Sequence, residues 1–312
     1  MIQKFRANGK LLLTGEYFIL DGALGLALPT QLGQSMEVLP NEMLGDLHMT
    51  SLDEHENAWF TATYALPDLS QLMASSDKIG QRFGQILKAI RTLNPDFLNT
   101  YDGQVAITNL EFPRNWGLGS SSTLIYMMAK WAGVDPYALL AKTFRGSGYD
   151  IACAGADGPI HYAFREEKPI SSPSKFAPAF SDQLYFVFLG KKQDSREGIA
   201  RYRALGKIDK SLISQIQNLT TAIAAAEKLD DFERFLTEHE NLVAATLQLT
   251  RAKDLYFADF WGTIKSLGAW GGDFILATSN RTEAETRTYF AEKGFSVFLK
   301  YKELILQRPD KK

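Results

Sequence analysis

The sequence predicts a mixed α and β protein (α+β) in two domains, and three observations support this. The chain has 312 residues, more than a single domain usually contains. Short apolar runs bounded by Gly, Pro and Asp alternate with longer segments of helical apolar spacing. Residues 168–181 are rich in Pro and Ser, which is typical of a linker. The predicted domains are therefore 1–172 and 173–312, and a cleft between domains is the natural place for a site.

Strands are predicted where short apolar runs end at turn residues. The opening segment, 2–38, alternates such runs with Gly and Asp, as expected for strands joined by tight turns. The continuous apolar run at 184–189 indicates a buried strand. The further predicted strands are 47–50, 58–64, 104–110, 160–164, 274–277 and 295–301.

Helices are predicted where apolar residues recur every three or four positions. In residues 76–93 the pattern is carried by Phe83, Ile86, Leu87 and Ile90. Two long amphipathic helices are predicted between residues 210 and 251. The other predicted helices are 123–131, 136–144 and 282–293.

Composition excludes several classes of function. Lys and Arg number 34 against 36 Asp and Glu, and no basic block is present, so nucleic acid is not an expected partner. The single cysteine, Cys153, cannot form an internal disulfide, and the first residues do not resemble a signal peptide, so a cytoplasmic location is expected. No apolar stretch reaches the roughly 20 residues that span a bilayer, so no membrane insertion is expected.

The strongest local signal is the run Gly117-Leu118-Gly119-Ser120-Ser121-Ser122, which lies between a predicted strand and a predicted helix. Glycines let the backbone approach a polyphosphate, and free amides at the helix start point toward it. The run is neither a Walker loop nor a dinucleotide fingerprint. The alternative for this segment alone is an ordinary serine-rich helix cap.

The serine run is one of three motifs that occur in a characteristic order. The others are Ala7-Asn8-Gly9-Lys10-Leu11-Leu12-Leu13-Thr14-Gly15-Glu16-Tyr17 and Lys265-Ser266-Leu267-Gly268-Ala269-Trp270-Gly271-Gly272-Asp273. Together they resemble the signature motifs of the galactokinase, homoserine kinase, mevalonate kinase and phosphomevalonate kinase (GHMP) superfamily. The segment Gly148-Tyr149-Asp150-Ile151-Ala152 resembles the loop that carries the catalytic aspartate in the mevalonate branch. The closest resemblance is to mevalonate and phosphomevalonate kinases.

The resemblance implies a fold and a reaction. It implies an N-terminal ATP-binding α/β domain with a left-handed crossover of the ribosomal-protein type, and a ferredoxin-like α+β C-terminal domain. It also implies transfer of the γ-phosphoryl group of ATP, with Mg²⁺, to a hydroxyl or phosphate acceptor. Mevalonate or phosphomevalonate, in isoprenoid precursor synthesis, is the expected acceptor.

The resemblance also implies roles for particular residues. Asp150 would be the base or orienting carboxylate at the acceptor oxygen, and Lys10 would lower the pKa of the acceptor and neutralise developing charge. Ser121 would contact Mg²⁺ and the phosphates. The other implied cofactor-binding residues are Gly117, Leu118, Gly119, Ser120 and Ser122. The implied substrate-binding residues are Glu16, Tyr17, Gly148, Tyr149, Gly268, Ala269, Gly271 and Gly272, and the alternative for Glu16 is that it only holds the turn of the first motif.

The chain departs from the family pattern at several positions. Asn8 stands where Pro is common, Leu267 where Ser or Thr is usual, and Trp270 where a small glycine is usual. The predicted helix at 136–144 lacks the acidic residue that some mevalonate kinases use as a second metal ligand.

The acceptor and the activity are left open by these departures. Cations that would favour a phosphorylated acceptor are Arg145, Lys191, Lys192 and Arg196. The alternatives are a catalytically weakened nucleotide- or metabolite-binding protein, a kinase for another alcohol or sugar, and an ATP-consuming decarboxylase of the same fold. Exposed strands of the first domain leave a homodimer open.

Overall fold

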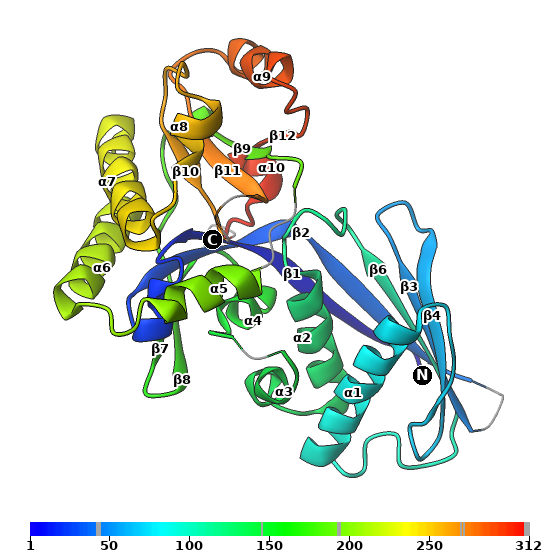
Figure 1. The fold of residues 1–312 in the computed structure, drawn as a ribbon. Helices are drawn as coiled ribbons and strands as arrows, with labels where there is room; N and C mark the ends of the chain where they lie inside the picture. The colour runs from blue at the N-terminus through cyan, green and yellow to red at the C-terminus, as the bar shows by residue number, and fades with distance from the viewer. Residues whose placement is uncertain (42–44, 145, 192–194, 269, 271, 309–312) are drawn as a thin grey trace. The chain divides into compact units, whose positions relative to one another are not determined.

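The computed structural model describes residues 1–312 except 42–44, 145, 192–194, 269, 271 and 309–312 (Figure 1). The chain forms two compact units. Unit 1 contains Met1–Gly9, Leu32–Arg114 and Gly119–Gly155, and unit 2 contains Lys10–Gln31, Asn115–Leu118 and Ala156–Lys312. The chain thus enters each unit several times. The two predicted domains, 1–172 and 173–312, divide the chain once along the sequence, which differs from this division into units. The domain boundary stays a prediction.

The sheet of unit 1 has the strand order β5-β4-β3-β6-β2. Neighbouring strands are antiparallel except for β3 and β6, which are parallel. Along β3, buried and half-buried residues alternate, as expected when one face of a strand packs on a core. Strands β1 (Gln3–Thr14) and β2 (Gly25–Pro40) pair with each other and contribute residues to both units. The other strands are β3 (Asp46–Leu52), β4 (Ala58–Ala65), β5 (Gln71–Ala74) and β6 (Gln104–Leu110).

Helices cover the sheet of unit 1 and share one core with it (Figure 1). The periodic residues that predict the first helix, Phe83, Ile86, Leu87 and Ile90, are all buried. The third helix begins at Pro136 because the Asp135 side chain accepts hydrogen bonds from two backbone N–H groups of its first turn. The helices are α1 (Asp77–Leu93), α2 (Ser120–Ala132), α3 (Pro136–Thr143) and α4 (Tyr149–Ala154).

Unit 2 contains an antiparallel sheet with the order β10-β11-β9-β12. Strands β9 and β11 are buried along their whole length, as their continuous apolar runs predict. This sheet packs on an aromatic core that includes Phe257, Phe260 and Phe290. Its strands are β9 (Leu184–Phe188), β10 (Ile264–Ser266), β11 (Phe274–Thr278) and β12 (Phe298–Lys300).

A hairpin in unit 2 corrects one expectation. Part of the segment predicted as a linker is a strand, β8 (Lys168–Pro173), which pairs with β7 (Ile160–Arg165). The turn is made by Glu166 and Glu167, both at positive φ. Such two-residue turns usually contain Gly or Asn. Neither residue occurs at this turn, so the sequence does not indicate a hairpin here. Strand β7 also pairs with the first residues of β2.

The helices of unit 2 include the two long ones that periodicity predicts, α6 and α7, which pack against each other. Helix α9 begins with a capping box formed by Thr282 and Glu285. The helices are α5 (Ser195–Ala204), α6 (Lys210–Ala224), α7 (Leu229–Leu247), α8 (Ala252–Tyr256), α9 (Glu283–Glu292) and α10 (Tyr301–Leu304), with the 3₁₀ turns η1 (Phe18–Asp21) and η2 (Ser181–Gln183).

A second core in unit 2 lies beneath the first motif. Tyr17 and Phe18 pack there with Tyr202 of α5 and with Trp270, which is 5% exposed. Residues of α6 and α7 complete this core. The indole that departs from the family pattern therefore fills a hydrophobic core rather than standing at the surface.

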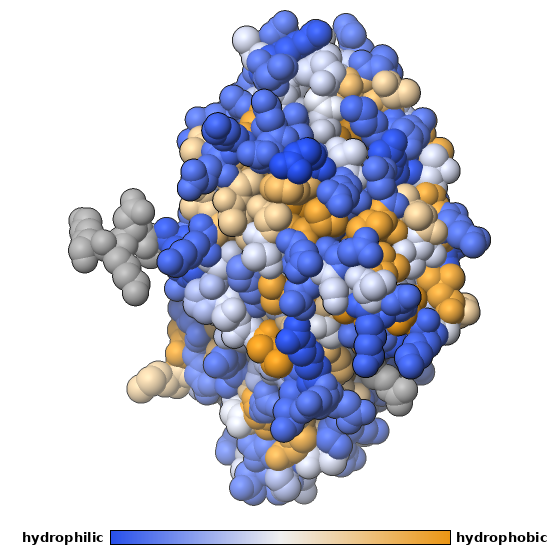
Figure 2. Space-filling model, turned by 90° about the vertical axis from the view of Figure 1, so that its left-hand side faces the viewer, coloured by the Kyte–Doolittle hydropathy of each residue, from blue (hydrophilic) through white to orange (hydrophobic). Residues whose placement is uncertain are grey.

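On the face shown in Figure 2, hydrophilic side chains are interspersed with smaller apolar areas. The exposed large apolar side chains include two consecutive pairs, Leu72 with Met73 and Leu255 with Tyr256. Within the described ranges, no helix combines the length and apolar character that a bilayer crossing needs.

Candidate functional site

The first motif and the glycine loop meet within unit 2. Lys10 lies in β1, and Gly117 and Leu118 belong to the loop Asn115–Leu118. The Lys10 ammonium donates a hydrogen bond to the Gly117 carbonyl oxygen at 2.8 Å, and the backbone N–H of Lys10 donates to the Leu118 carbonyl oxygen at 2.9 Å. A cation is thus held at the loop that the sequence predicts to bind phosphate.

The third motif connects strands β10 and β11 in unit 2. Gly268 has a φ of +61°, which favours glycine, and Gly272 is buried. Leu267, where Ser or Thr is usual in the family, is 1% exposed and belongs to the interior. Two of the predicted substrate-binding residues, Ala269 and Gly271, lie outside the described residues.

In unit 1, helix α2 begins at the serine run. Gly119 caps the helix with a φ of +95°, a left-handed conformation that glycine adopts without strain. The Ser122 hydroxyl donates to the Gly119 carbonyl at 2.7 Å and the Thr123 hydroxyl donates to Gln34 at 2.6 Å, so these two side chains fix the start of the helix. Ser121 is exposed. The first-turn N–H groups of a helix have no intrahelical acceptors, so they can bind an anion.

Asp150 lies on a short helix in unit 1, which corrects the expectation that it lies in a loop. Gly148 caps α4 with a φ of +83°, and Asp150 stands in the first turn. Its carboxylate accepts the Ile151 N–H at 3.0 Å and is half-buried. Ile151 and Ala154 anchor the helix in the core of unit 1, and Cys153 is buried. Helices α2 and α4 pack against each other.

Tyr17 is buried in unit 2 and holds the third motif. Its hydroxyl accepts the backbone N–H of Trp270 at 3.3 Å, and its ring stacks on Tyr202 with centroids 5.8 Å apart. Burial raises the pKa of this phenol. Helix α5 approaches closely at Gly198, where a Cβ atom would lie 2.3 Å from the Tyr17 hydroxyl. Tyr17 therefore ties the first motif, the third motif and α5 together.

Glu16 belongs to a buried network of charged side chains in unit 2. The Lys265 ammonium donates to a Glu16 carboxylate oxygen, to Glu240 at 3.1 Å and to the Ser266 carbonyl at 2.8 Å. The exposed fractions of Glu16, Lys265 and Glu240 are 1%, 0% and 2%. The Glu16 side chain therefore binds the third motif, and its substrate-binding role stays a prediction. No local sequence pattern indicates the network, because its members are far apart in the chain.

Burial sets the protonation of this network. Desolvation raises the pKa of Glu16 from 4.5 to about 7, although Lys265 opposes the change. Desolvation also acts against a charged Lys265, but the two carboxylates outweigh it and raise the pKa of the ammonium. His239 is buried, and desolvation lowers its pKa well below 6.5. Its Nε2 atom accepts the Gly15 N–H at 3.0 Å, so the imidazole is neutral and its 3.6 Å approach to Glu16 is not an ion pair.

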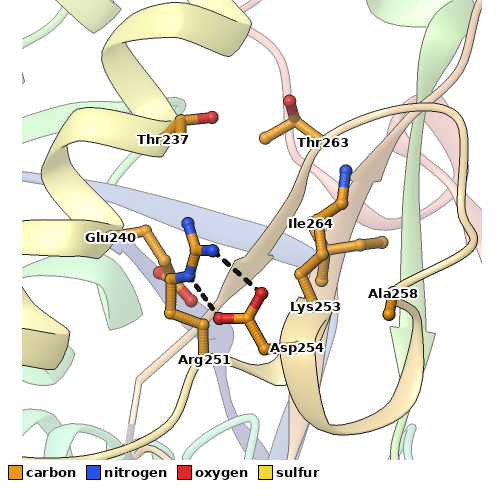
Figure 3. A pocket seen from close by; sticks show the side chains of 8 residues that line it. All are labelled: Thr237, Glu240, Arg251, Lys253, Asp254, Ala258, Thr263 and Ile264. Carbon is orange, nitrogen blue, oxygen red and sulfur yellow. Dashed lines mark hydrogen bonds and ion pairs between the residues drawn. The ribbon is translucent and has the colours of Figure 1, made fainter.

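A polar pocket of about 290 Å³ lies beside this network in unit 2 (Figure 3). Glu240 reaches it from α7, and Arg251 forms a two-point ion pair with Asp254 at its edge, with distances of 2.7 and 2.8 Å. No sequence motif indicates this pocket. Its lining residues are Thr237, Glu240, Arg251, Lys253, Asp254, Ala258, Thr263 and Ile264.

Of the four cations expected near the acceptor, one side chain is among the described residues. Lys191 is exposed. Arg145 and Lys192 lie outside the described residues, as does the side chain of Arg196. In the part of the chain that the structure describes, no three His, Cys, Asp or Glu side chains are grouped to hold a metal ion.

The predicted site residues divide between the two units. Within unit 2 the structure brings Lys10 together with Gly117 and Leu118, and brings Tyr17 together with the third motif. Within unit 1 it brings the helix of the serine run together with the helix of Asp150.

Solved structures of other proteins have the same architecture as this chain. Mevalonate kinase from Methanococcus jannaschii is 16% identical, with a TM-score of 0.70 and coverage of 98% of both chains. Streptococcus pneumoniae phosphomevalonate kinase is 15% identical, with a TM-score of 0.70 over 96% of this chain and 99% of that one. Lactococcus lactis galactokinase is 12% identical, with a TM-score of 0.67 over 98% and 94%.

No family model matches the sequence, and no curated protein matches it. The likeness is therefore one of fold, and it extends over nearly the whole chain. Mevalonate kinase, phosphomevalonate kinase and galactokinase are all members of one superfamily. This chain has the two-domain α+β fold of the GHMP kinase superfamily, as its three sequence motifs predict.

Proposed function

We propose that this protein is an ATP-dependent kinase that transfers the γ-phosphoryl group of ATP to a hydroxyl or phosphate group of a small metabolite. The observation that carries the proposal is the 2.8 Å hydrogen bond from the Lys10 ammonium to the carbonyl oxygen of Gly117. It fixes a cation at a glycine loop that runs directly into helix α2. Cations and helix N-termini are the groups that stabilise transferring phosphoryl groups.

The phosphates of ATP bind at the start of helix α2. Backbone N–H groups of Gly119, Ser120 and Ser121 donate to phosphate oxygens, and the exposed Ser121 hydroxyl is a hard oxygen donor that fits Mg²⁺. The buried Ser122 hydroxyl keeps the helix cap in place. Mg²⁺ would supply positive charge to the β- and γ-phosphate oxygens.

The acceptor is activated by Asp150 and Lys10. The acceptor oxygen attacks the γ-phosphorus, the bond to the β-phosphate oxygen breaks, ADP leaves, and the acceptor proton passes to the Asp150 carboxylate. Lys10 neutralises the charge that develops on the acceptor oxygen and the transferring group.

The solved relatives support a small-molecule acceptor. The Streptococcus pneumoniae phosphomevalonate kinase structure holds phosphomevalonate and AMPPNP, and the Leishmania major mevalonate kinase structure holds R-mevalonate. The Lactococcus lactis galactokinase structure holds galactose. We infer mevalonate or phosphomevalonate, in isoprenoid precursor synthesis, as the acceptor to test before other alcohols and sugars.

A coupled assay of ADP release tests the proposal. Mevalonate, phosphomevalonate, homoserine and simple sugars are compared as acceptors for the unchanged protein and for Asp150→Asn. One acceptor is expected to stimulate ADP release, and Asp150→Asn is expected to lower turnover by about 10²- to 10⁴-fold. Nucleotide affinity, measured by calorimetry, is expected to stay unchanged because Asp150 acts on the acceptor.

Asp96→Asn is a matched control, because Asp96 is an exposed carboxylate of the same unit. It should leave turnover unchanged. Equal ADP release with every acceptor and in both aspartate variants, with nucleotide still bound, would contradict the kinase and favour a nonenzymatic nucleotide-binding protein.

A further inference from the structure

Two consecutive residues of helix α7 bind the backbones of two different motifs. The His239 Nε2 atom accepts the Gly15 N–H of the first motif at 3.0 Å. A carboxylate oxygen of Glu240 accepts the Ser266 N–H of the third motif, also at 3.0 Å. Both side chains are buried. One turn of one helix in unit 2 therefore holds both motifs by their main chains.

Lys265 completes the connection between the two motifs. Its ammonium donates to Glu16 of the first motif, to Glu240 at 3.1 Å and to the Ser266 carbonyl at 2.8 Å. An ammonium has three N–H donors, so each of them has an acceptor in this network. A shift of either motif relative to α7 must therefore break at least one of these buried hydrogen bonds.

Glycines make both motifs depend on such bonds. Gly15 has a φ of +85°, and an added Cβ atom would lie 2.8 Å from the Gly25 Cα atom. Gly268 of the third motif has a φ of +61°. Glycine has the greatest backbone freedom of any residue and carries no side chain that could pack. The bonds from α7 and from Lys265 supply fixed points that these glycines do not supply.

Stability alone does not account for this network. Desolvation raises the pKa of Glu16 to about 7, so Lys265 does not offset the cost of burying this carboxylate. Buried ion pairs can often be replaced by apolar side chains of similar volume without loss of stability. Charge-assisted hydrogen bonds also add geometric specificity, because they fix the groups that they join. The network therefore fits a role in placing the two motifs.

We propose that Lys265 and Glu240 are positioning residues that hold the first and third motifs in one arrangement, on which binding of the acceptor depends. The proposal rests on the proposed function, because it takes residues of both motifs to bind the acceptor. Neither side chain touches the acceptor, because both are buried. They act through the backbone of Ser266 and through the turn at Glu16.

Steady-state kinetics with the acceptor that stimulates ADP release test the role of Glu240. Glu240→Ala removes its bonds but leaves Lys265 with Glu16, so one cation still balances one carboxylate. We expect kcat/KM for the acceptor to fall at least about tenfold, mainly through a higher KM, because acceptor-binding residues are displaced. Glu240→Gln keeps an oxygen for the Ser266 N–H, so its effect should be smaller. A merely structural role would reduce the folded fraction, which lowers kcat and leaves KM unchanged.

Amide hydrogen exchange tests the link between the motifs without any measurement of turnover. Glu240 binds the third motif directly, whereas its effect on residues 12–18 of the first motif passes through Lys265. We therefore expect faster exchange in both motifs of Glu240→Ala. Residues 283–292, which form helix α9 of the same unit, should keep their exchange rate because the change is local.

Glu238→Ala is the matched control for both measurements. Glu238 is an exposed carboxylate beside His239 on the same helix. Its removal should change neither the kinetic constants nor the exchange of either motif.

A second variant keeps the test decisive if Glu240→Ala does not fold. The triple variant Glu16→Gln, Lys265→Met, Glu240→Gln removes the cation together with both carboxylates, so no buried charge is left without a partner. It is expected to fold and to lose the connection that Lys265 makes between the motifs. Its KM for the acceptor should rise as in Glu240→Ala.

The outcomes separate this proposal from the proposed function. If the folded variants keep the KM of the unchanged protein for the acceptor, the positioning role is wrong and the kinase stands. If exchange becomes faster only in the third motif, Lys265 does not link the motifs and the proposal is also wrong. If the unchanged protein releases no ADP with any acceptor, the proposed function fails and the acceptor role fails with it. Faster exchange in both motifs would then still show their link.

Discussion

The Lys265 ammonium and the Glu16 carboxylate form an ion pair in which neither side chain is more than 1% exposed. The two residues come from the third and first motifs, and Glu240 of α7 binds the same ammonium at 3.1 Å. One cation thus compensates two buried carboxylates, and burial, with a smaller contribution from the charge of Glu240, raises the pKa of Glu16. Within unit 2, the network joins the turn of the first motif to strand β10 and helix α7.

Removing the cation should cost far more stability than neutralising one anion. Lys265→Met leaves two buried carboxylates without a partner, so the free energy of unfolding at pH 8 is expected to fall by about 3–5 kcal/mol. Glu16→Gln keeps an oxygen that accepts from Lys265 and should cost about 1 kcal/mol. Chemical denaturation measures both. Lys4→Met is the control, because the Lys4–Glu37 pair is 70% and 44% exposed and its loss should not move the midpoint. Equal losses for Lys265→Met and Glu16→Gln would contradict this account.

Glu16 and His239 should make opposite contributions to the pH dependence of stability. The pKa of Glu16 is raised from 4.5 to about 7, so in this range the folded state keeps a proton that the unfolded state loses. The stability that Glu16 contributes therefore falls as pH rises from 4.5 to about 7. The pKa of His239 is lowered well below 6.5, so the unfolded state binds a proton that the folded state does not, and this contribution is lost as pH falls below 6.5. The two effects oppose each other between pH 4.5 and 6.5.

Single variants should separate the two effects. The quantity to compare is the unfolding free energy of His239→Gln minus that of Glu16→Gln. The contributions of the groups that both variants share are removed by this subtraction. This difference is expected to decrease from pH 4.5 to 6.5, because His239→Gln keeps only the Glu16 effect and Glu16→Gln keeps only the His239 effect. Denaturation series in several buffers measure it. A difference that stays constant or increases with pH would show that one of the two protonation states is wrong.

Local patterns predicted much of the fold, and the reasons are physical. The helix at Asp77–Leu93 and the strands β6 and β9 follow from periodicity, which depends only on neighbouring residues. Strand β8 and helix α4 were not predicted as such, because their turn residues and short lengths give little local signal. The Glu16–Lys265 pair joins residues 249 positions apart, so no sequence pattern indicates it. The meeting of Lys10 with the glycine loop was expected from the family resemblance, not from spacing.

Trp270 should contribute to stability through its ring and not through its indole N–H. The ring packs in the core beside Tyr17 and Tyr202, so Trp270→Ala is expected to cost about 3–5 kcal/mol. The Nε1 atom is buried and has no hydrogen-bond partner among the described residues. Trp270→Phe should therefore lose little stability. It removes a buried N–H group that has no partner, and this gain offsets part of the packing lost with the smaller ring. Chemical denaturation compares the two variants, and the prediction is wrong if Phe costs as much as Ala.

Gly117 should tolerate no side chain while Asp273 keeps its carboxylate. Gly117→Ala puts a methyl group 2.5 Å from the carboxylate carbon at a φ of +70°, so it carries both a clash and a left-handed backbone penalty. Gly133→Ala is a matched control, since Gly133 has a φ of +64° and nothing within 4 Å of its added Cβ, so it should cost only the backbone penalty of about 1–2 kcal/mol. Gly117→Ala should cost more, as measured by chemical denaturation.

The double variant Gly117→Ala with Asp273→Gly then isolates the clash. Removing the carboxylate frees the space for the methyl group, so the double variant should be more stable than the sum of the single changes predicts. The expected coupling is about 0.5–3 kcal/mol, as for residues in direct contact. The pair Gly133→Ala with Asp273→Gly should be additive, because Gly133 lies in unit 1 with open space around it. Additive effects for both pairs would mean that the Asp273 carboxylate does not lie on Gly117.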